Sequence, residues 1–503
     1  MYLLGLDIGS SSIKASLLQA SDGVVIAQNF EPKDEMNIIA HHNGWAEQDP
    51  ELWWNYVKSI VPKLIEDVQI DKSLITAIGI SYQMHGLVLV DKNKQALRPS
   101  IIWCDSRASE IGKEAFNTLG HNYCLENLLN SPGNFTASKL KWVKDNESEI
   151  FERIYKIMLP GDFIAMKLTD KITTTVSGLS EGVFWNFKED KISQTLLSHY
   201  GLEDTLIPEI HDTFSSHGTI TNEVANQLGL PVDIPVSYKS GDQPNNALSL
   251  NVLKPGEIAA TAGTSGVIYG VVDDIKPDLQ SRVNVFAHVN HKVEQPRYGV
   301  LACINGTGIL NAWLRKNITN GLSYSEMNEL ATTVDIGSNG LQVFPFGNGA
   351  ERILEDANIG CTWKHLNFNI HKKAHLLRAA QEGIVFSFQY GINIMKSMGL
   401  KLDVIKAGNS NMFQSSIFKE TLATLSGAQI EIYDTDGAIG AAIGSGIGAG
   451  IYKSSDEAFS RFQKLETIQP NKKMQSKLKD AYQNWEKELQ KNKIIYNQKN
   501  ISK

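Results

Sequence analysis

The chain has 503 residues, which is more than one ordinary hydrophobic core accommodates, so we expect at least two large domains. Hydrophobic residues make up 42% and charged residues 20%, as in water-soluble globular proteins. The net charge of −7, without a long basic stripe, argues against nucleic acid as the main partner. No apolar run reaches 18 residues, which argues against a membrane partner, and the Gly/Ala-rich stretch 438–451 is typical of a closely packed helix.

The cysteines and the N-terminal residues indicate the cellular compartment of the protein. Cys104, Cys124, Cys303 and Cys361 form no CxxC pair and have no metal-ligand spacing, which favours reduced thiols. The chain starts with a strand-like segment, without the basic and apolar regions of a signal peptide. We therefore expect a cytoplasmic protein.

The first 100 residues alternate strand and helix signals. Strands are predicted at 2–6, 13–18 and 24–29, with a turn at Gly9 between the first two. A helix begins after Asp49-Pro50, because Asp is a favoured N-cap and Pro a favoured first helical residue. Further strands are predicted at 74–82, 87–90 and 101–103, and residues 107–230 are predicted to be mostly helical.

The second half begins as the first does. A strand at 234–238 and a helix after Asp242 lead to a domain boundary near residue 250. Strands at 257–261 and 267–272 then flank a second Gly/Ser/Thr turn, which suggests a weak internal duplication. Later elements are strands at 404–407 and 430–433 and helices at 415–426, 437–450 and 473–490. Such halves predict a duplicated α/β architecture, with a nucleotide bound between them.

The two turns are the first candidates for function. No Walker A motif (GxxxxGK[ST]) occurs, and the Gly-rich stretch 444–448 is interpreted as helix packing. The turn at 9–12 gathers backbone N–H groups and hydroxyls as anion-binding turns do, although alone it is more often a plain hairpin. The turn at Gly263-Thr264 favours phosphate binding at both. Asp7, at a strand end, is a candidate for holding Mg²⁺ through water.

Asp242 is an isolated carboxylate between these turns. It is a candidate general base that takes a hydroxyl proton during phosphoryl transfer, a role that typically contributes about 10²–10⁴-fold. The alternative is an N-cap of the following helix, which Asp also favours. Both interpretations stay open from the residues alone.

Polar groups at two other strand ends suggest a polyol pocket. His85 is placed to donate to a sugar hydroxyl and Met84 to pack on a sugar's carbon face, although a buried core histidine is the alternative. Trp103 and Asp105 end a neighbouring strand. Such a pocket combines an apolar face with a few aimed polar groups.

Six segments in order carry a family resemblance: 7–12, 45–50, 83–86, 102–107, 241–242 and 263–266. Together they resemble the FGGY carbohydrate kinases, and within that family the xylulokinase group. The resemblance implies an α/β actin-like ATPase fold of two ribonuclease-H-like domains, with a nucleotide and sugar cleft between them. It implies transfer of the ATP γ-phosphoryl group to O5 of D-xylulose with Mg²⁺, and it suggests a homodimer.

The resemblance also implies the domains and the site. Residues 1–250 would carry the sugar site and the base and 251–485 the nucleotide site, while the Lys-rich composition of 486–503 predicts a polar tail. Asp242 would be the catalytic base, with Asp7 supporting metal and phosphates. The substrate-binding residues would be Gln83, Met84, His85, Trp103, Asp105 and Asn245, and the nucleotide-binding residues Ser10, Ser11, Ser12, Gly263, Thr264, Gly308, Gly408 and Asn409.

The chain departs from the family pattern at two places. The segment 407–411 lacks the Lys of the family's Gly-Gly-Gly-Ala-Lys-like sequence, which affects the adenosine contacts. Residues 243–246 replace the Asn-Ala-Ala-Gly common after the base, which affects the sugar. A kinase for another ketose (L-ribulose, D-ribulose or a hexulose) is therefore one alternative, and a non-enzymatic actin-like ATP-binding sugar sensor is another.

Overall fold

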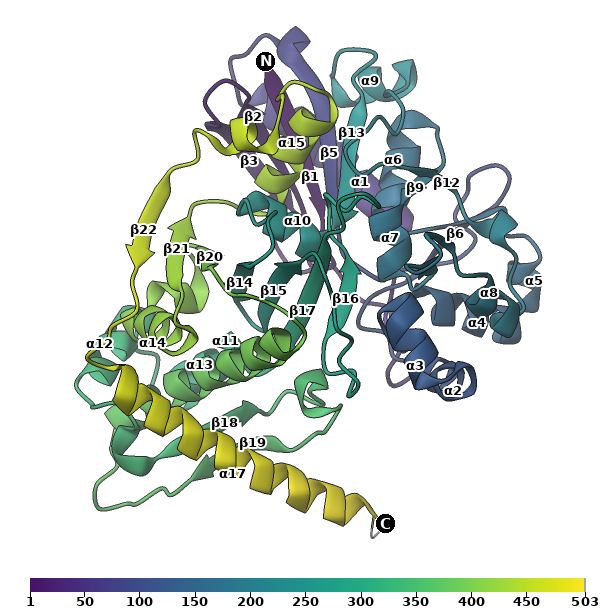
Figure 1. The fold of residues 1–503 in the computed structure, drawn as a ribbon. Coiled ribbons are helices and arrows are strands. Elements are labelled where there is room, and N and C mark those ends of the chain that lie inside the picture. The colour runs from purple at the N-terminus through teal and green to yellow at the C-terminus, as the bar shows by residue number, and fades with distance from the viewer. Residues whose placement is uncertain (502–503) are drawn as a thin grey trace. The chain divides into compact units, whose positions relative to one another are not determined.

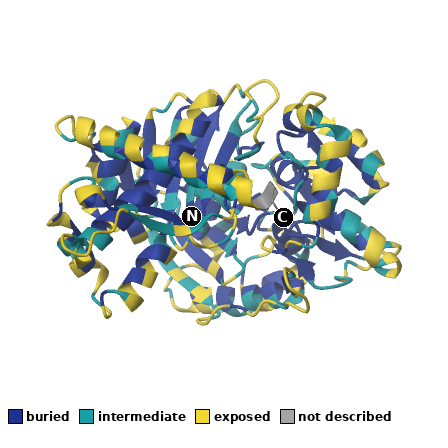
Figure 2. Cartoon of the chain, turned by 90° about the horizontal axis from the view of Figure 1, so that it is seen from below, coloured by how far each residue is buried: buried dark blue, intermediate teal, exposed yellow. Residues whose placement is uncertain are grey.

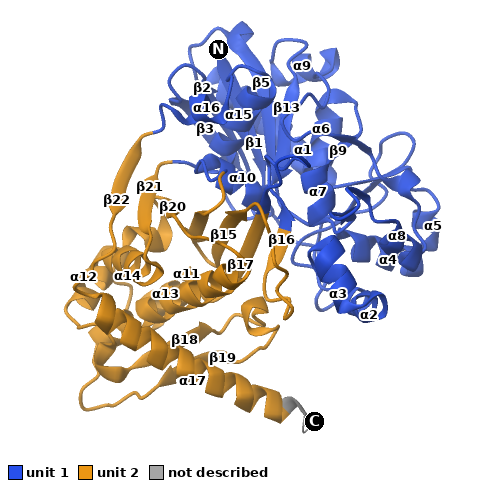
Figure 3. Ribbon diagram, viewed as in Figure 1, with its two compact units in different colours: residues 1–253, 286–298, 435–462 blue, residues 254–285, 299–434, 463–503 orange. Residues whose placement is uncertain are grey.

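The computed structural model describes residues 1–501, and they form two compact units (Figure 3). Unit 1 contains residues 1–253, 286–298 and 435–462, and unit 2 contains 254–285, 299–434 and the chain from 463 onward. The division therefore differs from the predicted single cut near 250, because residues 435–462 return to the first unit. In both units the strands are mostly buried, and exposed residues gather on loops and outer helix faces (Figure 2).

Unit 1 is built on a five-stranded sheet in the order β13-β5-β1-β2-β3 (Figure 1). β1 pairs antiparallel with β2 and parallel with β5, and β13 is parallel to β5. These strands span Tyr2–Ile8 (β1), Ile13–Gln19 (β2), Val25–Glu31 (β3), Ile75–Tyr82 (β5) and Val236–Gly241 (β13). The predicted hairpin and buried strand are thus confirmed.

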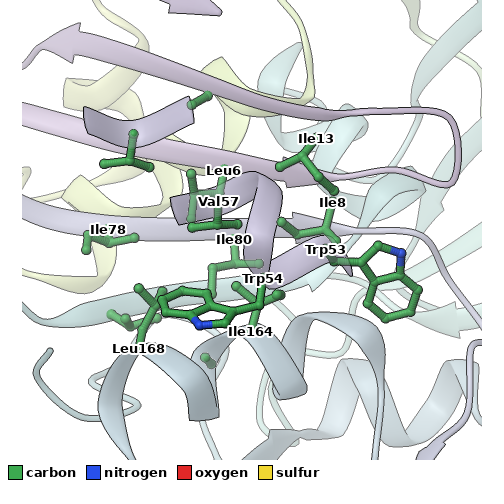
Figure 4. Close-up of a cluster of buried hydrophobic side chains, with 14 of the residues drawn as sticks. Leu6, Ile8, Ile13, Trp53, Trp54, Val57, Ile78, Ile80, Ile164 and Leu168 are labelled. Carbon is green, nitrogen blue, oxygen red and sulfur yellow. The ribbon is translucent and has the colours of Figure 1, made fainter. Parts of the chain in front are cut away.

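Helix α1 (Pro50–Glu66) covers one face of this sheet (Figure 4). Asp49 caps it by accepting a hydrogen bond from the Glu51 amide at 3.0 Å, as predicted. Its Trp53, Trp54 and Val57 pack among sheet residues such as Ile80, together with residues of α6 (Pro160–Thr169). Burial of this apolar stripe stabilises the unit by roughly 25 cal/mol per Å².

Helix α15 (Gly437–Gly448) packs in a second buried cluster of this unit and contacts β1, β5 and β13. A Cβ at Gly5 of β1 would overlap the main-chain oxygen of Ala438, and one at Gly79 of β5 would overlap that of Ala441. Small residues therefore let the helix lie directly on the strands. The Gly-rich stretch 444–448 lies inside this helix, which confirms its interpretation as packing.

Between β5 and β13 the chain forms helices and short strands of unit 1. Residues 107–230 contain more strand than the sequence predicts, because five two- or three-residue strands pair locally. The helices are α2 (Ser109–Leu119), α3 (His121–Tyr123), η2 (Cys124–Leu128), α4 (Thr136–Asn146), α5 (Ser148–Phe151), α7 (Val176–Glu181), α8 (Gln194–Tyr200), η3 (Asp204–Leu206) and α9 (Asn222–Leu228). The strands are β8 (Lys156–Met158), β9 (Thr173–Thr175), β10 (Trp185–Asn186), β11 (Lys191–Ile192) and β12 (Glu209–His211). The unit also contains β4 (Glu47–Gln48), η1 (Lys72–Leu74), β6 (Val88–Val90), β7 (Ser100–Ile101), α10 (Asp242–Ser249) and α16 (Ser455–Phe459).

The larger sheet of the structure has the order β16-β17-β15-β14-β20-β21-β22. Its strands span Asn284–Ala287 (β16), Tyr298–Ile304 (β17), Gly266–Val272 (β15), Glu257–Ala262 (β14), Val404–Gly408 (β20), Gln429–Tyr433 (β21) and Lys464–Ile468 (β22). β14 is antiparallel to β15 and parallel to β20, as β1 is to β2 and β5. The strand order of unit 1 is thus repeated here, which confirms the predicted duplication.

The helices of unit 2 include α17, which continues past the predicted helix end at 490. Leu489 is fully buried, and the helix spans Gln475–Ile501, so 486–501 are helical. The remaining elements are α11 (Gly308–Asn317), α12 (Tyr324–Thr332), η4 (Ser338–Gly340), β18 (Gln342–Phe346), η5 (Arg352–Leu354), β19 (Gly360–Lys364), α13 (Lys373–Ser397), η6 (Asn411–Gln414) and α14 (Ser416–Ser426). Within residues 1–501, no helix combines the length and the apolar character needed to cross a bilayer.

Candidate active site

Three parallel strands of unit 1 deliver the candidate groups to one sheet edge. Asp7 of β1 lies opposite Ser81 of β5, which lies opposite Ser240 of β13. One residue further, the strands end, and the chain continues into Gln83 and Asp242. Because carboxyl ends of parallel strands share an edge where ligands bind, the register gathers these groups.

Asp242 is the first residue of α10, and Gly241 occupies the N-cap position. The structure therefore assigns the cap to the glycine and not to Asp242. Burial, followed by the charge of Asp7, raises the pKa of Asp242 to about 7, while hydrogen bonds with Gln243 partly oppose this. A carboxylate with such a pKa is well matched to accept a proton near neutral pH.

Asp7 lies close to the start of α15. A Cβ at Gly437 would lie 2.6 Å from Asp7 Oδ2, so glycine leaves room for the carboxylate. Burial raises the pKa of Asp7, while Lys14 and a hydrogen bond from Ser81 oppose the shift. Among residues 1–501, no group of three or more His, Cys, Asp or Glu forms a direct metal site. A carboxylate can hold Mg²⁺ through the waters that this ion keeps, and this role of Asp7 stays a prediction.

His85 and Met84 pack close to the base. His85 has a left-handed backbone (φ 60°), and its Nδ1 lies 2.9 Å from the main-chain oxygen of Glu181. Since a carbonyl oxygen only accepts, Nδ1 carries the proton, so Nε2 of the neutral ring would accept from a sugar hydroxyl and not donate to it, contrary to the prediction. Met84 is buried, and a Cβ at Gly241 would lie 2.6 Å from Met84 Cγ. The predicted sugar segment and the base segment are therefore in contact.

Gln83 and Asn245 are buried amides that join segments of unit 1. Gln83 Nε2 donates to Gln48 Oε1 at 3.3 Å, and Asn245 Nδ2 donates to the Gly437 oxygen at 2.8 Å. Their side-chain oxygens have no hydrogen-bond partner within the described residues. Their role in substrate binding stays a prediction, whereas their hydrogen bonds to Gln48 and to the start of α15 are visible.

Trp103 and Asp105 differ sharply in exposure. Trp103 is 54% exposed, and its Nε1 donates to Ser10 Oγ at 3.2 Å. Asp105 is fully buried and accepts from the Ala46 amide at 2.6 Å and from Arg107 Nη2 at 2.7 Å. The exposed indole fits an open apolar face, while the Asp105 carboxylate holds the loop 102–107. A direct sugar contact by Asp105 stays a prediction.

The turn of the first hairpin contains the predicted phosphate residues Ser10, Ser11 and Ser12. The Gly9 amide donates to the Ser12 oxygen at 3.1 Å, which closes the turn. The Ser11 oxygen accepts from the Met36 amide at 2.9 Å. The Ser10 hydroxyl links this turn to Trp103, so two predicted sites adjoin in unit 1.

In unit 2 the equivalent turn packs against the start of α11. The Gly308 amide donates to the Gly263 oxygen at 2.8 Å, and the Ile309 amide donates to the Thr264 oxygen at 3.1 Å. A Cβ at Gly308 would overlap the Gly263 oxygen, so only glycine permits this approach. Three predicted nucleotide residues thus meet at a helix N-terminus, where anions are favoured.

Unit 2 contains separate cavities, including one of about 390 Å³ and one of about 450 Å³. The cavity of about 450 Å³ lies beside Gly308 and adjoins this turn. Gln381 braces its wall by donating to Asn328 Oδ1 at 2.9 Å and accepting from Ser415 Oγ at 2.6 Å. The lining residues are Gly308, Asn311, Tyr324, Ser325, Asn328, Asn411, Met412, Gln414 and Ser415.

Most of these lining residues were not predicted from the sequence. They come from α11, α12 and η6, which are far apart in the chain. Gly308 was predicted, Asn311 follows it by three residues, and Asn411 follows the predicted Asn409 by two. Gly408 ends β20, and the Asn409 amide donates to the Tyr433 oxygen at 2.9 Å. Gly308 and the Gly-Asn turn were thus the local signals for this pocket.

Comparison with protein families decides the class. Residues 2–249 match the N-terminal domain of the FGGY family of carbohydrate kinases, and residues 258–449 match its C-terminal domain. The chain belongs to the FGGY family of carbohydrate kinases. It is therefore a sugar kinase, and the expected two-domain actin-like ATPase fold is confirmed.

Individual FGGY kinases resemble the whole chain. A xylulose kinase of Staphylococcus xylosus is 27% identical over 490 residues, which cover 96% of this chain and 99% of that protein. A solved xyloylose kinase of Brucella ovis is 26% identical, with a TM-score of 0.87 and coverage of 97% and 98%. A gluconate kinase of Lactobacillus acidophilus has a TM-score of 0.88 at 23% identity, with 99% of each chain covered, so it shares the fold alone.

Proposed function

We propose that this FGGY kinase transfers the γ-phosphoryl group of ATP to O5 of D-xylulose. The observation that carries the proposal is Asp242, whose pKa of about 7 and contact with the Met84 segment suit a base beside a sugar. The full-length similarity to xylulose kinases supports the choice of sugar. A homodimer and a cytoplasmic location stay predictions.

In the proposed reaction, Asp242 accepts the proton of the sugar O5 hydroxyl. The bond from O5 to the γ-phosphorus forms, the bond from that phosphorus to the β–γ bridging oxygen breaks, and ADP leaves. Met84 would contact the carbon face of the sugar and His85 a hydroxyl, with the exposed Trp103 as a further apolar surface. Because phosphoryl transfer needs little covalent chemistry from the protein, positioning supplies most of the rate.

Unit 2 would bind the nucleotide. The turn at Gly263 and Thr264 and the N-terminus of α11 offer backbone N–H groups to phosphate oxygens. The neighbouring cavity of about 450 Å³ is large enough for an adenosine and offers amide side chains such as Asn328. Mg²⁺, when bound, would neutralise phosphate charge, and Asp7 would hold its water shell.

Another ketose is the alternative substrate, because residues 243–246, directly after the candidate base, depart from the family pattern. Asn245 is buried and donates to Gly437, so one of the residues that depart from the family pattern helps to place α15 beside Asp7. The sugar-sensor alternative is not supported, since the chain belongs to a kinase family.

A substrate panel tests the proposal. ADP release with Mg²⁺ and ATP would be measured for D-xylulose, L-xylulose, D-ribulose, L-ribulose, D-fructose, D-gluconate and glycerol. We expect kcat/KM for D-xylulose to exceed every other sugar at least about tenfold, since one well-placed hydrogen bond is worth that factor. A higher kcat/KM for another sugar would reassign the substrate and keep the kinase.

His85→Ala tests the sugar pocket. We expect the sugar KM to rise at least about tenfold, because a side-chain hydrogen bond to the substrate is lost, while the ATP KM changes less than about twofold. His121→Ala, at an exposed histidine of α3, is the matched control and should change neither. Equal increases of both KM values would remove His85 from the sugar pocket.

A further inference from the structure

Lys139 is a fully buried lysine of α4 that makes two main-chain contacts. Its Nζ donates to the oxygen of His85 at 2.8 Å and to the oxygen of Ile102 at 2.9 Å. His85 belongs to the predicted sugar segment after β5, and Ile102 directly precedes Trp103. One ammonium group therefore joins the two segments that carry the predicted sugar residues.

Burial of this ammonium group is costly, because charged groups lose their hydration. Burial lowers the pKa of Lys139 to about 7. The charges that face it are Asp105 and Cys104, which raise that pKa, and Arg107, which lowers it. An apolar side chain would avoid this cost, so the lysine has a role beyond filling space.

The backbone that Lys139 contacts is constrained. His85 adopts a left-handed conformation, which is uncommon for a non-glycine residue. The Leu87 amide donates to the Ile101 oxygen at 2.9 Å, and the Ile101 amide donates to the Leu87 oxygen at 3.2 Å. The two segments are thus already joined by the backbone pairing of Leu87 with Ile101. Lys139 adds a second connection between them, at His85 and Ile102, next to the predicted sugar residues.

We propose that Lys139 is a positioning residue of the sugar site, whose two hydrogen bonds hold His85 and Trp103 in register with each other. The inference rests on the proposed sugar-binding role of these residues. It extends that role, since Lys139 itself, buried behind the main chain, touches no substrate. Hydrogen bonds from a charged donor are roughly twice as strong as neutral ones, which suits this purpose.

Hydrogen exchange tests the tie without any substrate. Lys139→Met keeps the aliphatic stem and removes the ammonium group, and we expect amides in 83–90 and 100–107 to exchange at least about tenfold faster. Lys156→Met is the matched control, since Lys156 Nζ also bridges two main-chain oxygens, those of Thr205 and Ile207, at 2.7 and 2.8 Å. In Lys156→Met, faster amide exchange should be confined to residues 203–209. Unchanged exchange in 83–90 and 100–107 of folded Lys139→Met would overturn the proposal.

Kinetics test the consequence. Lys139→Met should raise the sugar KM at least about tenfold and leave the ATP KM within about twofold, whereas Lys156→Met should change neither. A purely structural role would lower stability without this split, and an unchanged sugar KM would overturn the inference. If no sugar of the panel is phosphorylated, the proposed function fails, and the exchange data alone decide the tie.

The wild-type protein provides a test that needs no variant. Because the pKa of Lys139 is about 7, its charge is lost above that pH, and the sugar KM should rise between pH 7 and 9. The ATP KM should stay constant over the same range. A sugar KM independent of pH would contradict the role of the charge, even if Lys139→Met fails to fold.

Discussion

Asp242→Asn is expected to lower kcat by at least about 10²-fold, because asparagine cannot accept the hydroxyl proton. Sugar and ATP should still bind, since the amide has nearly the volume and shape of the carboxyl group. A coupled ADP assay measures kcat, and calorimetric titration with the sugar measures binding. A kcat within threefold of wild type would show that another group takes the proton.

Although Asp242→Asn is expected to lower kcat, it is expected to raise the stability of the folded protein at alkaline pH. The pKa of Asp242 is raised in the folded state to about 7, so the folded protein binds a proton more tightly than the unfolded chain. In the wild type, the contribution of Asp242 to the free energy of unfolding is therefore fully present below pH 4, and it is lost as the pH rises through 7. Asp242→Asn removes that loss, and thermal unfolding should show a higher Tm than wild type at pH 8. A lower Tm would instead point to a structural role of the carboxylate.

The pH profile of the wild type follows from the same pKa. The base must be ionised to work, so kcat should rise with pH through an apparent pKa of about 7. The measurement is kcat at saturating sugar and ATP from pH 5 to 9. A flat profile below pH 7 would contradict the base assignment.

Gly308→Ala is expected to raise the ATP KM at least about tenfold. The added methyl group would overlap the main-chain oxygen of Gly263 and push α11 away from the phosphate turn. The sugar KM should change less than about twofold, since the sugar residues belong to unit 1. Steady-state kinetics with each substrate varied in turn measure both constants.

Gly270→Ala in β15 is the matched control for this variant. Its Cβ would meet Leu400 and Met395 at 3.4 Å, an ordinary contact, so the ATP KM should stay within about twofold of wild type. An unchanged ATP KM in Gly308→Ala would show that the approach of α11 to the turn does not set nucleotide binding.

Local sequence signals predicted the elements that position the site. The hairpin β1–β2 and the cap of α1 depend on neighbouring residues, namely alternation, a turn and an Asp-Pro pair, so they were readable in one stretch. The sequence did not predict the end of α17, since the composition of 486–501 is polar. In the structure this segment is helical, and its Leu489 is buried. A buried contact with a distant segment is not visible in local composition.

The site residues also fall into two groups, those predicted from the sequence and those found only in the structure. The turns at Gly9 and Gly263, and the carboxylates of Asp7 and Asp242, were found from the sequence because each stands at a strand end. The pocket residue Asn328, by contrast, belongs to α12, whose sequence carries no phosphate- or sugar-binding motif, and it reaches the pocket only through the packing of that helix. Lys139 was missed for the same reason, since its partners are main-chain oxygens 37 and 54 residues away.

The sequence by itself determined the duplicated α/β plan, the kinase family and the candidate base, because these depend on short motifs in a fixed order. Only the tertiary structure decided that Gly241 and not Asp242 occupies the N-cap, and that Asp7 lies near enough to raise the pKa of Asp242. It also decided that Lys139 ties His85 to Ile102. The physical reason is that burial and charge interactions depend on distances in space, which residues far apart in the chain acquire only on folding.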